Sequence, residues 1–258
     1  MPSTDTTPAA PRGATHAAAH AASPTGARRS AATPGTLPPA RLRALKTLIW
    51  VLALLPFARL VYLGATAQYG ANPLEFVTRS TGTWTLVMLC ATLAVTPLRR
   101  LSGWNWLLRI RRLLGLFAFF YGTLHFMLWL GVDRGFDLAY MAKDVFKRPF
   151  ITMGFAAFVL MVPLAATSTH AMVRRLGGRR WQALHRSIYA IAVLAILHYW
   201  WHKAGKNDFG EVSIYAAVVA ALLGARLWWW WRGTARAATT AAAPRESSRQ
   251  SSPQQSRQ

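Results

Sequence analysis

The stretch Trp181–His202, WQALHRSIYAIAVLAILHYWWH, decides how the rest of the chain is interpreted. It is a mostly apolar run of the length that crosses a bilayer, for which about 20 residues are needed. His185 lies near its start and His198 near its end. Metal-coordinating or ionisable side chains inside a membrane span are costly, so they are candidates for function. The stretch therefore predicts a membrane helix with a histidine-based site.

Five further apolar runs make the chain, which is 53% hydrophobic over 258 residues, a predicted membrane protein. The six candidate spans are approximately Leu45–Leu63, Gly82–Leu98, Leu113–Val132, Phe150–Thr167, Ala183–Trp201 and Val212–Trp231. Residues 1–40 and 233–258 contain no apolar run and have the composition of disordered tails. We expect an all-α integral membrane bundle of six transmembrane helices over residues 41–232, between two disordered tails.

The net charge of +22 has a topological explanation, because most of it flanks the apolar runs. Arginines dominate the N-terminal flank and every second loop, whereas the other loops mix acidic and basic residues. By the positive-inside rule both termini are cytoplasmic, and nucleic-acid binding is not expected. All eight acidic residues lie outside the runs, which argues against an ion- or proton-coupled transporter. The single cysteine, Cys90, excludes a four-cysteine iron–sulfur site.

Three histidines lie within the predicted spans: His125 on the third, and His185 and His198 on the fifth. Imidazole is the usual axial ligand of b-type haem, and a pair from two helices suits electron transfer. The third and fifth spans run in the same direction, and His125 and His198 lie late in each. They are the predicted axial pair. His185 lies about 19 Å from His198 along a helix and cannot share its iron.

His185 has no histidine at matching depth on the third span, where Arg111 and Arg112 lie instead. It could serve a different cofactor, a quinone, or only a hydrogen bond. Arg59, in the outer half of the first span, either snorkels to the surface or pairs with a haem propionate. Arg226, near the inner end of the sixth span, is expected to snorkel. The outer loops offer four lysines that could steer an acidic partner, namely Lys143, Lys147, Lys203 and Lys206.

Four stretches resemble the MsrQ (YedZ) family of haem-binding membrane subunits, which belongs to the ferric-reductase-like transmembrane group. They are TGTWTLVMLCATLAVTPLRR (81–100), RRLLGLFAFFYGTLHFMLW (111–129), RPFITMGF (148–155) and STHAMVRRLGGRRWQALHRSIYAIAVLAILHYWW (168–201). The resemblance covers roughly residues 42–232. The family's histidine motifs fall on His125, His185 and His198, which the resemblance implies as haem-iron ligands.

The resemblance implies a six-helix protein of the bacterial inner membrane that carries haem b and FMN. Its implied partner is a periplasmic molybdopterin methionine-sulfoxide reductase, and its implied donor is the quinone pool or a cytosolic flavin reductase. Arg111 and Arg112, with Trp181, Gln182 and His185, are one hypothetical location for the flavin or a quinone. No G-x-G-x-x-G motif follows a predicted strand, so electrons are expected to come from a separate donor.

Two other functions stay open at this point. One is a different redox role on the same scaffold, as a stand-alone ferric reductase or a quinol-oxidising cytochrome b. The other is a transporter or assembly factor without haem. Because an electron-transfer subunit need not itself carry out a reaction, the sequence does not decide whether the chain is an enzyme.

Overall fold

The computed structural model describes residues 37–133, 135–205 and 207–242, all within one compact unit. This part of the chain consists of helices joined by short turns and contains no strand. Residues 1–36 and 243–258, most of the two predicted disordered tails, lie outside the described residues.

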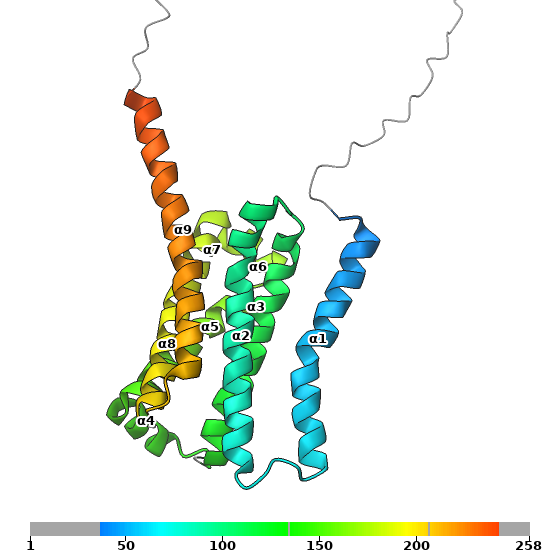
Figure 1. The fold of residues 1–258 in the computed structure, drawn as a ribbon, viewed down its shortest axis with the longest axis vertical. Coiled ribbons are helices and arrows are strands. Elements are labelled where there is room, and N and C mark those ends of the chain that lie inside the picture. Colours follow the sequence, from blue (N-terminus) through cyan, green and yellow to red (C-terminus); the bar gives the residue numbers. More distant parts are fainter. Residues whose placement is uncertain (1–36, 134, 206, 243–258) are drawn as a thin grey trace, which may run out of the picture. The chain divides into compact units, whose positions relative to one another are not determined.

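The helices follow one another along the chain in the order shown in Figure 1. They are α1 Pro39–Ala65, α2 Pro73–Ser102, α3 Leu107–Met127, the π-helix η1 Leu128–Asp133, α4 Leu138–Lys147, α5 Pro149–Ala166, α6 His170–Leu176, α7 Gly178–His185, α8 Ile188–Ala204 and α9 Gly210–Ala242.

Five of these helices are long and apolar enough to cross a membrane: α1, α2, α3 with η1, α5 and α9. The chain is a multi-pass, all-α membrane protein, as predicted, although the count of six spans is not exact. The difference lies in α8, which has 17 residues and a length of about 26 Å, against a hydrocarbon core of about 30 Å.

The prediction of one continuous helix through Ala183–Trp201 was wrong. Helix α7 ends at His185 and α8 begins at Ile188. At the junction the backbone N–H of Ser187 donates to Leu184 three residues earlier, and the Ser187 hydroxyl donates to the same carbonyl. A serine hydroxyl competes with the backbone for carbonyls, so this break has a local cause. The predicted distance from His185 to His198, which assumed an unbroken helix, no longer applies.

Two segments predicted as loops contain short helices, and one helix is longer than predicted. Helix α4 lies between the third and fourth predicted spans, and α6 lies between the fourth and fifth. Helix α7 begins in that second loop and ends inside the fifth predicted span. Helix α9 continues past the predicted boundary at residue 232 to Ala242. Its last turns are rich in alanine, which has the highest helix propensity of all residues.

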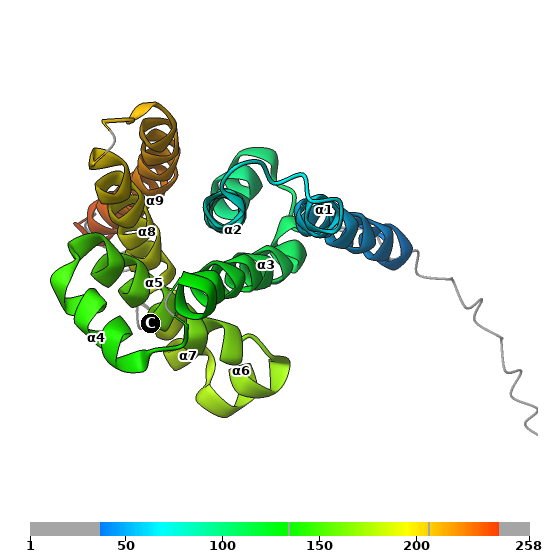
Figure 2. The ribbon, with the colours of Figure 1, turned by 90° about the horizontal axis from the view of Figure 1, so that it is seen from below.

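The core lies where α2 packs on α3 and α5 packs on α8, with α9 against both α2 and α8 (Figure 2). Leu89, Leu93 and Ile191 are fully buried there. Helix α1 joins this core through α3. The Tyr121 hydroxyl donates to the carbonyl of Ala53 at 2.6 Å and accepts from the N–H of Phe57 at 3.2 Å.

The Tyr121 hydroxyl is thereby inserted into a hydrogen bond of α1 beside Pro56. Proline lacks an N–H and disturbs the helix before it, and an inserted side chain can satisfy the separated groups. Tyr121 is wholly buried, so this contact both anchors α1 and compensates for the proline.

The two ends of the bundle differ in charge, as the loops predict. The basic end comprises the α2–α3 turn together with α6 and α7, and the mixed-charge end comprises the α1–α2 turn, α4 and the α8–α9 turn (Figure 1).

Candidate functional site

His125 and His198 lie side by side near the mixed-charge end, as the direction and depth of their helices predicted. His125 is in the last turn of α3 and His198 is in α8. Their ring centroids are 6.1 Å apart and their planes are inclined at 79°. The π-helix η1 begins three residues after His125, and such π-helical turns occur frequently at functional sites.

Each imidazole is oriented by a backbone carbonyl of a neighbouring helix. The Nδ1 atom of His125 lies 2.9 Å from the carbonyl oxygen of Thr78 in α2. The Nδ1 atom of His198 lies 2.7 Å from the carbonyl oxygen of Phe150 in α5. A carbonyl can only accept, so Nδ1 carries the proton in both neutral rings and Nε2 keeps its lone pair. This arrangement of the second nitrogen is typical of histidines that bind a metal through Nε2.

A glycine faces each of the two rings. A Cβ added to Gly154 in α5 would lie 2.7 Å from Nδ1 of His198, and one added to Gly82 in α2 would lie 3.1 Å from Cε1 of His125. Both distances are below ordinary van der Waals contact. The absence of a side chain at these two positions is therefore what admits the rings between the helices.

The separation of the rings fits two ligands on one iron. Fe–N bonds to imidazole are about 2 Å, and the ring centroid lies roughly 1.1 Å behind the nitrogen, so two axial imidazoles have centroids about 6 Å apart. One turn beyond His125, the indole N–H of Trp129 is buried and has no acceptor among the described residues. The donor set, the spacing and this free donor suit a haem with its anionic carboxylates.

His185 lies apart from this pair and is held by protein contacts. Its Nε2 lies 3.1 Å from Oγ1 of Thr167, whose own hydroxyl donates to the Pro163 carbonyl at 2.6 Å. The hydroxyl has one proton, so His185 is the donor in this contact. Trp181 stacks on the imidazole with centroids 3.9 Å apart, and its indole N–H donates to Thr167. These contacts tie α7 to the end of α5.

The predicted cationic residues lie at opposite ends of the bundle. Arg111 and Arg112 are in the first turns of α3 at the basic end. Burial lowers the pKa of His185, and the positive charge of Arg111 lowers it further. Arg59 is exposed on α1, with its guanidinium 5.8 Å from the ring centroid of Phe76 in the first turn of α2. No direct contact joins Arg59 to the histidine pair among the described residues.

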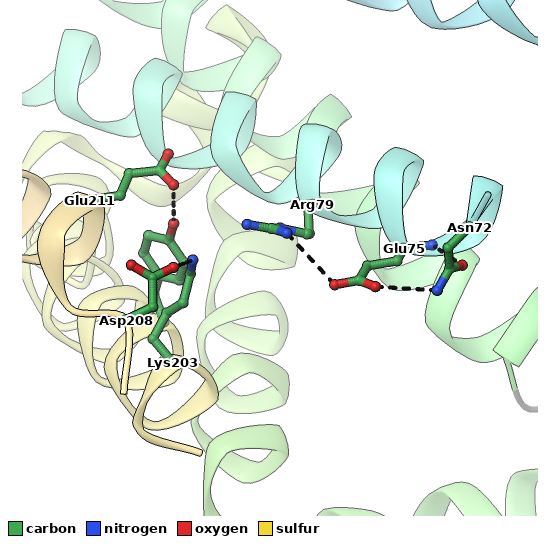
Figure 3. A network of polar contacts seen from close by, with 7 residues as sticks. Asn72, Glu75, Arg79, Lys203, Asp208 and Glu211 are labelled. Atoms are coloured by element: carbon green, nitrogen blue, oxygen red, sulfur yellow. Dashed lines mark hydrogen bonds and ion pairs between the residues drawn. The ribbon is translucent and has the colours of Figure 1, made fainter. Parts of the chain in front are cut away.

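Polar contacts join side chains at the mixed-charge end of the bundle (Figure 3). Lys203 donates to the Asp208 carboxylate at 2.5 Å, and Tyr199 donates to Glu211 at 2.7 Å. Lys203 is only 2% exposed, so the expectation that it steers a partner is wrong. Arg79 pairs with Glu75, which also accepts from the capping Asn72. Lys143 and Lys147 of α4 are exposed, whereas Lys206 lies outside the described residues.

Comparisons with known proteins identify the family. Residues 81–196 match the model of the ferric reductase like transmembrane component. The chain is 75% identical over 194 residues to the protein-methionine-sulfoxide reductase heme-binding subunit MsrQ of Ralstonia nicotianae, which covers 75% of this chain and 89% of that protein. The MsrQ of Herminiimonas arsenicoxydans is 61% identical over 189 residues, covering 73% and 87%. The chain belongs to the MsrQ family. Membership supports a role in membrane electron transfer.

Several residues of the site carried no recognisable signal in the sequence. The carbonyls of Thr78 and Phe150 act through the backbone, so their side chains do not reveal them. Gly82 and Gly154 are single glycines inside apolar runs. A conserved glycine within a helix often marks close packing, but one sequence does not distinguish such a position from a neutral one.

Proposed function

We propose that the chain binds haem b through Nε2 of His125 and Nε2 of His198 and transfers electrons across a membrane. The observation that carries this is the pair of rings 6.1 Å apart, each with Nδ1 bonded to a carbonyl of a neighbouring helix. A haem held there would supply one-electron transfer. The protein's own part is to fix the tautomer and orientation of both ligands.

The surroundings of the pair suit this role. Phe150 lies against both His198 and His202, with centroids 6.2 and 5.9 Å away, and supplies an apolar wall next to the rings. The buried indole N–H of Trp129 is available to a haem carboxylate. Because His185 donates from Nε2 to Thr167, we propose a structural role for it in place of the predicted ligation.

The wider assignment rests on the family. The relatives are named as heme-binding subunits of a protein-methionine-sulfoxide reductase. We propose that this chain passes electrons from the quinone pool or a cytosolic flavin reductase to a periplasmic molybdopterin methionine-sulfoxide reductase, from the bacterial inner membrane with both termini cytoplasmic. FMN is the proposed second cofactor.

Haem retention tests the ligand pair. Full-length protein purified in detergent should show a low-spin b-type absorption spectrum, and His125→Ala and His198→Ala should each lose most of the haem. His170→Ala is the matched control, because His170 is exposed at the start of α6. Equal haem content in wild type and both ligand variants would refute the assignment.

Deletion of the gene tests the proposed partner, with repair of oxidised periplasmic methionine as the assay. If repair is unchanged and ferric reduction is lost, the result favours a stand-alone reductase.

A further inference from the structure

The side chain of Arg226 in α9 lies between helices. Its Nη1 donates to the carbonyl of Leu222 at 3.2 Å, and its Nη2 donates to the carbonyl of Leu93 in α2. The guanidinium carbon lies 5.5 Å from the ring centroid of Tyr189 in α8. The expected snorkelling of Arg226 is therefore replaced by contacts with two neighbouring helices.

Pro97 explains why Leu93 accepts this bond. In an α-helix the carbonyl of Leu93 would accept from the N–H of residue 97, and proline has none. Arg226 supplies the missing donor. This contact needs only a hydrogen-bond donor and does not need a positive charge, so it leaves the charge of Arg226 unexplained.

That charge lies among other positive charges. Arg100 of α2 and Arg111 of α3 both act electrostatically on Arg226. The Nε atoms of Arg226 and of Arg99 are buried and have no hydrogen-bond partner among the described residues. Two guanidinium donors are thus available at the basic end, in a place where water is partly excluded.

No described carboxylate balances these arginines. The acidic side chains that the structure describes all lie on elements of the mixed-charge end, namely Glu75, Asp137, Asp144, Asp208 and Glu211. Placing the partly buried guanidinium of Arg226 among like charges is costly unless an anion neutralises them. Guanidinium groups bind phosphate oxygens with paired hydrogen bonds, and Tyr189 and Trp229 add aromatic surface next to Arg226 and Arg100.

We propose that Arg226, Arg100 and Arg111 form a binding site for a phosphate group at the basic end, between α2, α3 and α9. The phosphate belongs either to the headgroup of an anionic phospholipid or to a soluble phosphate ester. The site lies at the opposite end from His125 and His198, and the proposal does not depend on haem being bound there.

Arg226→Gln is the most informative variant, since glutamine keeps an N–H donor for Leu93 and removes the charge. The full-length protein is titrated with flavin mononucleotide, followed by its fluorescence, with inorganic phosphate as competitor. In parallel, the protein is reconstituted either with phosphatidylglycerol, which is anionic, or with phosphatidylcholine, which is not. Native mass spectrometry then counts the lipid molecules that each sample retains. Arg232→Gln is the matched control, because Arg232 is exposed on α9 and lies 4.3 Å from the ring centroid of Trp228.

The proposal predicts that Arg226→Gln and Arg111→Gln each weaken the binding of flavin mononucleotide or of phosphatidylglycerol about tenfold or more. Arg232→Gln should leave the binding of both ligands unchanged. Weakened flavin binding that phosphate competes away identifies a soluble ester, and selective loss of phosphatidylglycerol identifies the lipid. Equal binding of both ligands by Arg226→Gln, Arg111→Gln and Arg232→Gln would overturn the proposal and leave Arg226 as a partner of Leu93 only. If Arg226→Gln does not fold, Arg111→Gln decides alone. Haem content should be unchanged throughout, which separates this site from the histidine pair.

Discussion

Replacing Gly154 with alanine is the sharpest test of how the histidine pair is held. The added Cβ would lie 2.7 Å from Nδ1, 2.9 Å from Cε1 and 3.1 Å from Cγ of His198. The added Cβ would clash with three atoms along one edge of the ring, so the imidazole must move away from α5. The hydrogen bond from Nδ1 to the Phe150 carbonyl, now 2.7 Å, would then lengthen or break.

The size of the effect follows from these contacts. Loss of the partner that orients a metal-binding histidine weakens metal affinity by about 10- to 100-fold. We expect this range for haem binding by Gly154→Ala. Gly82→Ala should weaken it less, about tenfold or below, because its Cβ would lie 3.1 Å from Cε1 and 3.2 Å from Nδ1 of His125 and a small shift relieves the contact.

The assay is haem titration of the apoprotein in detergent, followed by the Soret absorbance. Gly224→Ala is the control, because a Cβ there meets nothing within 4 Å. It should bind haem as the wild type does and be more stable by about 0.5–1 kcal/mol, the usual gain from alanine in a helix. Equal haem affinity in Gly154→Ala and Gly224→Ala would refute the argument that Gly154 makes room for a ligand.

Three further predictions concern other contacts. Tyr121→Phe should lower the free energy of unfolding by about 1–3 kcal/mol, since two buried backbone groups of α1 lose their shared partner; thermal unfolding checks this. Asp208→Asn should destabilise by a similar amount, about 1–3 kcal/mol, because the buried Lys203 loses its carboxylate, and an unchanged melting temperature would contradict it. Lys143→Glu with Lys147→Glu should slow electron transfer to the partner most strongly at low salt; a rate that does not depend on salt in either protein would exclude electrostatic steering.

The sequence predicted correctly that His125 and His198 lie close together, because two simple regularities apply to membrane helices. Alternate spans run in the same direction, and the position of a residue along its span gives its depth. His125 and His198 lie late in spans of the same direction, and the structure brings their rings together. The apolar runs likewise indicated the bundle, because a bilayer requires long helices.

The prediction failed where a side-chain hydrogen bond breaks a helix or buries a charge. Hydropathy gave no indication that Ser187 would break the run from Trp181 to His202, or that Arg226 would bond to the carbonyl exposed by Pro97. Lys203 was taken for a surface charge because it follows an apolar run, yet the turn between α8 and α9 folds back and places Asp208 against it. The bond of Arg226 depends on three-dimensional proximity, which spacing along one helix does not contain. The other two contacts are local, but hydropathy does not register hydrogen bonds.

The most direct test of the central claim is the midpoint potential of the haem in His198→Met. If His198 ligates the iron, methionine should replace one imidazole, retain haem and raise the potential, because a methionine ligand favours the reduced iron. His170→Met, at an exposed position, should leave the potential unchanged. A potential in His198→Met equal to that of the wild type, with full haem content, would contradict ligation by His198 and the account built on it.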